Sequence, residues 1–139
     1  MAKAMSITVA AADAMLTAFG TLCNSGIVRI YNGTMPTNVQ TALSSNTVLA
    51  EATMANPAFS GFTTNGNNRT YAAAGTPFGD ASANASGNAS FFRVFTSGDV
   101  AVWQGTVGTA DSDMIMAAVD IAATGPVNIT SMSVSLPMA

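Results

Sequence analysis

Few side chains in this sequence could carry out chemistry, and none could act as an imidazole base. The 139 residues contain one cysteine, Cys23, and no histidine. Cys–His and Ser–His pairs depend on the imidazole to activate the nucleophile, so both arrangements are excluded. Because Cys23 lies in an apolar segment, we expect a small buried side chain rather than a reactive thiol. The sequence therefore predicts a protein that is not an enzyme.

Acidic residues form the second group of candidates. Asp111 and Asp113 are two residues apart and Asp120 follows, which resembles part of a calcium loop. An EF-hand loop needs more oxygen ligands and a closing glutamate, so we expect no metal site here. Asp80 and Asp111 could form a carboxylate pair for acid–base chemistry, but no sequence feature brings them together. We expect turn roles for both, with no catalytic residue and no cofactor.

Charge is sparse along the whole chain. Four basic and seven acidic residues make up 8% of the sequence, whereas charged residues are about a quarter of an ordinary soluble domain. The basic residues are scattered singly and form no stripe that could neutralise phosphates, so nucleic-acid binding is not expected. Uncharged residues must cover the surface, which suits a subunit that lies against other proteins.

The sequence predicts neither a secretory signal nor a membrane span. Its first residues include Lys3 and Asp13 and contain no continuous apolar core. No segment reaches the roughly eighteen apolar residues that a spanning helix needs. We expect a protein made in the cytoplasm and without a membrane partner.

One helix is expected near the N-terminus. Its apolar residues recur at helical spacing and would form one buried face. They are Ala12, Met15, Leu16, Phe19, Leu22 and Cys23. Thr8 or Ser6 would cap the helix, Asp13 would lie in its first turns near the positive end of the dipole, and Asn24–Gly26 would end it.

Beyond Gly26 the pattern changes to strands separated by turns. The expected strands are residues 27–31, 47–54, 89–96, 100–107, 114–121 and 127–136. The apolar phase slips near Ser131, which indicates a bulge. Because no crossover helix separates the strands, we predict one mainly β domain, an antiparallel β-sandwich of jelly-roll or immunoglobulin-like type with one short N-terminal helix. Residues 1–26 would form the arm and helix, and residues 27–139 the β-rich body.

The segment from Ser60 to Asn88 is rich in Gly, Asn, Ala, Ser and Thr, so we expect short strands and long loops there. Phe62 and Phe78 stand alone in it. An isolated loop aromatic is either an anchor on the core or a hot spot of an interface. Both interpretations stay open, and these two residues are the candidate interface residues.

The sequence also predicts roles for the charged residues of the expected strands and for the methionines. Charged residues among apolar neighbours in the expected strands should form cross-strand ion pairs, because an unpaired buried charge is costly. They are Arg29, Glu51, Arg93 and Asp120.

Methionines at pattern positions should fill the core, whereas those in turns or near the ends would suit an adaptable contact surface. The first set is Met15, Met54, Met114, Met116 and Met132, and the second is Met1, Met5, Met35 and Met138.

The segment that follows the expected helix carries a resemblance. From Asn24 to Pro36 it reads Asn-Ser-Gly-Ile-Val-Arg-Ile-Tyr-Asn-Gly-Thr-Met-Pro. This string is similar to the opening of a family of small virion proteins of tailed bacteriophages and prophages. Later landmarks follow in the same order: Leu49–Glu51, the Ala/Gly/Asn/Ser tract, Phe92-Arg93, Gly105–Gly108 and the pair Asp111 and Asp113.

The resemblance implies a non-enzymatic component of a virion that is made in the bacterial host. The specific role that we expect is a capsid decoration or cement protein, which packs on the major capsid protein and stabilises the head. The alternative is a neck, tail or fibre component, acting as an adaptor or a host-contacting tip. Expected partners are the major capsid protein or other virion proteins, together with further copies of the chain. A carbohydrate-binding module is disfavoured, because only Trp103, Tyr31 and Tyr71 could stack on sugar rings.

Overall fold

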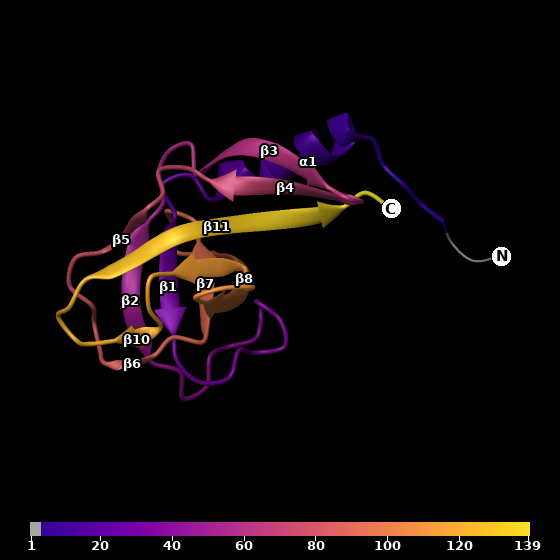
Figure 1. Ribbon diagram of the computed structural model, residues 1–139. Helices are drawn as coiled ribbons and strands as arrows, with labels where there is room; N and C mark the ends of the chain where they lie inside the picture. Colours follow the sequence, from indigo (N-terminus) through magenta and orange to yellow (C-terminus); the bar gives the residue numbers. More distant parts are fainter. Residues whose placement is uncertain (1–3) are drawn as a thin grey trace.

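The computed structural model describes residues 4–139, and within them it contains one helix and eleven strands (Figure 1). The helix α1 spans Val9–Leu22. The strands are β1 (Ile27–Tyr31), β2 (Val48–Thr53), β3 (Phe59–Asn65), β4 (Asn68–Ala73), β5 (Phe78–Asp80), β6 (Gly87–Asn88), β7 (Phe91–Phe95), β8 (Ala101–Gly108), β9 (Met114–Met116), β10 (Asp120–Ile121) and β11 (Val127–Pro137). The mainly β class with one N-terminal helix is therefore confirmed.

The main sheet has nine strands and curls round on itself. Its order is β2-β1-β7-β8-β9-β11-β4-β3, and β5 also pairs with β11. The long strand β11 changes partners along its length, from β5 and β9 to β4, and crosses the molecule in Figure 1. Because β5, which pairs with β11, also contacts β2 at the start of the order, the sheet closes around one core through β5. The bulge expected near Ser131 is confirmed as a register shift between Ile129 and Ser131.

The core is lined by residues that alternate along the strands. Val28 and Ile30 of β1 lie beside Val94 and Phe92 of β7, and all four are fully buried. Alternation of this kind is typical of a sheet with one face toward the core. The expected core methionines Met54, Met114, Met116 and Met132 are buried.

One pair of strands corrects the expectation of an antiparallel arrangement. β8 and β9 are parallel, with Val107 opposite Met114. The connection between them is residues 109–113, much shorter than a helical crossover. Asp113 holds this connection because its Oδ2 atom accepts a 2.9 Å hydrogen bond from the amide of Thr106. The predicted strand 114–121 is also wrong in extent, since the structure divides it into β9 and β10.

Helix α1 begins after Thr8, as expected, and the Thr8 hydroxyl accepts a 3.1 Å hydrogen bond from the amide of Ala11. Leu16 is buried, and half-buried Phe19 packs against the rings of Phe59 and Trp103. Asp13 binds Arg69 of β4 at 2.6 Å and is not in the first turn.

The predicted buried face of the helix is wrong at Met15 and Leu22. These side chains are 53% and 55% exposed. The helix rests on β4 and the neighbouring aromatic rings, so only a narrow arc containing Ala12, Leu16 and Gly20 is fully covered. Spacing alone marks an apolar arc but does not say how wide the supporting surface is.

The Gly- and Asn-rich tract contains more regular structure than predicted. β3 and β4 form a hairpin across the turn Gly66-Asn67, with Asn65 opposite Asn68. Gly66 has φ +60, the left-handed conformation that glycine adopts without steric cost. The dipeptide Gly66-Asn67 is a two-residue hairpin signal in the sequence.

Candidate interaction surface

Cys23, the one thiol, is fully buried at the end of α1. Burial raises its pKa to about 11, and a weak interaction with the indole N–H of Trp103 offsets only part of that effect. A thiol with this pKa is almost entirely protonated at neutral pH, so it is a poor nucleophile. The arrangement supports a packing role for Cys23.

The acidic residues considered as a possible catalytic or metal site lie on separate elements. Asp80 accepts hydrogen bonds from the amides of Glu51 and Ser82, both at 2.9 Å. Asp111 and Asp113 lie in the connection between β8 and β9, where Asp111 has φ +51 and Asp113 accepts a hydrogen bond from the amide of Thr106 of β8. Across residues 4–139, no three His, Cys, Asp or Glu side chains converge as metal ligands would. The structure therefore places Asp111 in a turn, as expected, whereas the turn role expected for Asp80 is wrong, because Asp80 is the last residue of β5 and pairs with Val127 of β11.

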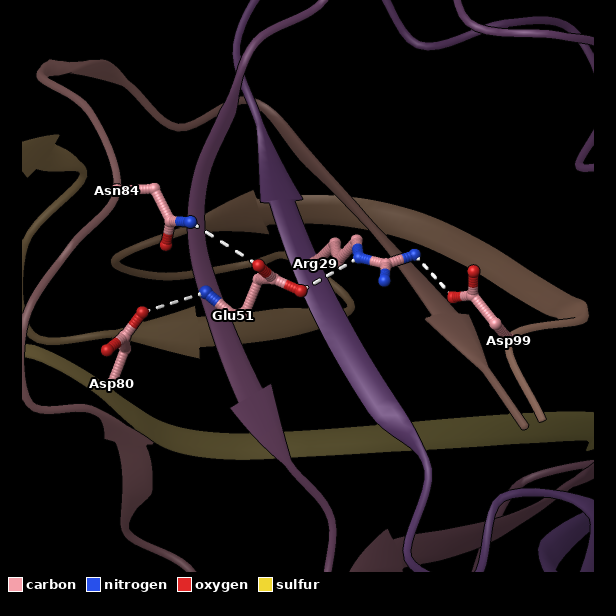
Figure 2. Close-up of polar contacts among 5 residues, drawn as sticks. All are labelled: Arg29, Glu51, Asp80, Asn84 and Asp99. Carbon is pink, nitrogen blue, oxygen red and sulfur yellow. Dashed lines mark hydrogen bonds and ion pairs between the residues drawn. The ribbon is translucent and has the colours of Figure 1, made fainter. Parts of the chain in front are cut away.

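A row of polar side chains crosses strands β2, β1, β7 and β8 on the face opposite the core. Arg29 lies opposite Glu51 and binds it at 3.0 Å, and its other end binds Asp99 at 2.7 Å (Figure 2). The expected cross-strand ion pair is confirmed here. Burial alone would lower the pKa of Arg29, but the hydrogen bonds to Glu51 and Asp99 raise it. Asn84 donates to the other Glu51 oxygen at 3.3 Å.

The ion pair predicted for Arg93 is wrong, and its actual role was not foreseen. Arg93 is 5% exposed and has no carboxylate partner among the described residues. Its Nε atom donates to Gln104 at 2.9 Å, and its Nη2 atom donates to the carbonyl oxygens of Thr41 at 2.7 Å and Asn38 at 3.4 Å. Gln104 in turn donates to the carbonyl oxygen of Pro36 at 2.7 Å. Together these two side chains hold loop 34–46 against the sheet.

Asp120, the last of the expected ion-pair residues, is exposed on β10 and forms none of the ion pairs found in residues 4–139. Lys3 and Met1 lie outside the described residues. No signal in the sequence distinguishes Arg29 from Arg93, since both stand in apolar strands and face each other in the register of β1 and β7.

Within the segment Asn24–Pro36, structural roles are found for Gly26, Asn32 and Pro36. A Cβ atom on Gly26 would collide with the backbone oxygen of Phe95, so glycine is required between α1 and β1. Asn32 accepts from the amide of Thr47 at 2.7 Å and closes the base of loop 34–46. Pro36 supplies the carbonyl that Gln104 binds.

Phe62 and Phe78, the candidate interface residues, occupy different environments. Phe78 of β5 is half-buried and packs against the main core. Phe62 of β3 stacks on Tyr71 with ring centroids 4.2 Å apart, and Arg69 lies 5.2 Å from its ring. The half-buried Phe62 ring is thus part of the hairpin rather than of the main core.

The opposite side of this hairpin is uncharged. Alternate residues of β3, β4 and the end of β11 lie on it, and their pairing register places them side by side. We call this the hydroxyl face, and it consists of Thr63, Asn65, Asn68, Thr70, Ala72, Ser133, Ser135 and Pro137. The hydroxyl oxygens of Thr70 and Ser135 lie 2.9 Å apart. The face offers hydroxyl and amide groups and methyl surface to whatever lies against it.

Comparison of the chain with protein-family models, curated proteins and solved structures found no match. Within residues 4–139, no helix combines the length and apolar character that crossing a membrane requires.

Proposed function

We propose that this protein is a non-enzymatic structural component of the virion of a tailed bacteriophage, acting as a capsid decoration or cement protein. In this role it packs on the major capsid protein and stabilises the head. The proposal combines the resemblance of Asn24–Pro36 to phage virion proteins with the surface chemistry described above.

The observation that carries the proposal is the uncharged hydroxyl face. Arg29 and Arg69 are already bound to carboxylates, and Arg93 is buried, so the described part of the chain leaves little positive charge for a partner. Attachment through such a surface depends on shape, hydrogen bonds and apolar area rather than on Coulomb attraction. The many equivalent sites of a capsid shell allow a modest interface of this kind to act in large numbers.

The test is to add the purified protein to capsids that lack it and to measure occupancy at low and high salt. We expect occupancy to persist at high salt, because there is little charge attraction to screen. The double variant Thr63→Glu and Ser135→Glu places charge on the hydroxyl face and should abolish binding. Thr109→Glu, which adds charge at an exposed position in the turn before β9, is the matched control and should bind like the wild type.

Copy number in the virion distinguishes the head from the neck and tail. A decoration protein should be present in numbers that follow the symmetry of the shell, measured by quantitative mass spectrometry of purified particles. A low copy number would replace the cement role with a neck, tail or fibre role. Release of the wild-type protein by salt alone would contradict attachment through neutral contacts.

A further inference from the structure

Helix α1 has a second apolar stripe, and its two large side chains are exposed. It comprises Ala11, Met15, Ala18 and Leu22, which follow one another at spacings of four, three and four residues. Such spacing places the four side chains in one line along the helix. Met15 and Leu22 are 53% and 55% exposed. Figure 1 shows α1 at the upper margin of the molecule, beside β4.

The stripe is complementary to itself. Large and small residues alternate along it, and its midpoint lies between Leu16 and Thr17. If two copies of α1 pair antiparallel about that midpoint, Met15 lies opposite the second copy's Ala18, and Leu22 lies opposite its Ala11. Each large side chain then meets a small one, which allows the two helices to approach closely without leaving gaps.

Charge also favours a second copy as the occupant. A two-fold axis brings each surface against itself, so any charge near the axis would meet a like charge. The only charged residue of α1 is Asp13, which is bound to Arg69. The stripe itself is uncharged. Met15 also lines an apolar groove of about 250 Å³, which lies between residues 5–7 of the N-terminal arm and residues 136–139 at the end of the chain.

We infer that two copies of this chain associate through α1, antiparallel and across a two-fold axis, with Met15 of one copy packed on Ala18 of the other. The inference stands on the helix alone and does not depend on the attachment to capsids. Because one pair of helices of this length is a small interface, the association is concentration-dependent.

The test is sedimentation of the purified chain over a range of concentrations. We expect the mass to rise from 14.0 kDa toward twice that value. Met15→Lys and Ala18→Glu should each keep the protein monomeric at every concentration, because each variant places a charge against an apolar surface. The matched controls Thr17→Lys and Thr17→Glu alter an exposed position off the stripe and should associate like the wild type.

A mixture of the two stripe variants tests the antiparallel register. In a heterodimer of the Met15→Lys chain with the Ala18→Glu chain, the introduced ammonium of one copy would lie opposite the introduced carboxylate of the other, so mixing should restore association. Circular dichroism of each variant verifies that the fold is intact. A wild-type chain that stays monomeric, or a dimer that survives both stripe variants, would overturn the inference. Failure of the mixture to associate would overturn the register.

Discussion

The Oδ2 atom of Asp80 accepts a 2.9 Å hydrogen bond from the backbone amide of Glu51, and this bond joins β5 to β2 (Figure 2). β2 is the first strand in the order of the main sheet. β5 pairs with β11, which lies toward the other end of that order. One carboxylate therefore fastens the two sides of the curled sheet.

Replacing Asp80 should weaken the contact between β5 and β2. We expect Asp80→Ala to lower the free energy of unfolding by about 1–3 kcal/mol, because the part-buried amide of Glu51 loses its acceptor. Asp80→Asn keeps one acceptor oxygen and should recover most of the loss. Urea denaturation measures both variants, with Asp120→Asn, at an exposed position, as the control. Equal stability of Asp80→Ala and the wild type would show that the hydrogen bond from Glu51 to Asp80 does not stabilise the fold.

Loop 34–46 should depend on Arg93. Arg93→Met removes the donors to the carbonyl oxygens of Asn38 and Thr41, so we expect a loss of about 3 kcal/mol. The loop should also become sensitive to limited proteolysis. Arg93→Lys retains a charged donor and should show an intermediate effect. A loop that is equally protected in Arg93→Met and the wild type would mean that other contacts hold it.

The aromatic contact between helix and sheet can be measured through Phe19. Its ring centroid lies 6.0 Å from that of Phe59 and 5.6 Å from that of Trp103. We expect Phe19→Ala to lower the free energy of unfolding by about 3 kcal/mol, because it leaves a cavity at this contact. Val100→Ala, at a position that is 63% exposed, should change it by less than about 0.5 kcal/mol. A similarly small effect at Phe19 would show that the helix is held elsewhere.

The buried thiol should make stability depend on pH in the alkaline range. The pKa of Cys23 is about 11 in the folded chain against 9.0 for the free side chain. The folded state therefore holds its proton more tightly, and the stability present below pH 9.0 is lost as the pH rises toward 11. We expect a fall on the order of 2–3 kcal/mol over this interval.

Cys23→Ala serves as the control, because the part of the alkaline loss due to the thiol should disappear in that variant. Tyr31, whose pKa burial also raises, contributes equally to both proteins and cancels in the comparison. A thiol reagent at neutral pH should react slowly with the folded wild type and fast after unfolding. Fast reaction with the folded chain would contradict the raised pKa.

Phe62 and Phe78 should respond differently to the same substitution. Phe78→Asp places a charge against the main core, so we expect the chain to unfold. Phe62→Asp removes the stacking on Tyr71, worth about 0.5–1.5 kcal/mol, and should leave a folded protein. Thermal unfolding separates these outcomes, and Phe62→Leu is the apolar control. If Phe62→Asp also unfolds the chain, Phe62 is a core anchor and not an interface residue.

Local features of the fold were predictable from the sequence because they depend on neighbours along the chain. The strand at Ile27–Tyr31 and the bulge near Ser131 follow from side-chain type and period, and the sequence narrows the helix cap to Thr8 or Ser6, of which the structure uses Thr8. The absence of histidine likewise follows from the sequence, and with it the exclusion of His-dependent nucleophiles.

Only the tertiary structure decided which residues meet across the chain. Arg29 and Arg93 stand in similar apolar strands, yet one reaches Glu51 and the other reaches a loop more than fifty residues away in sequence, at Thr41. The parallel pairing of β8 with β9 and the exposure of Met15 and Leu22 also depend on strand order and on how much of the helix the sheet covers. The period of a sequence shows which side chains share a face, but the partner of that face is set by contacts between distant segments.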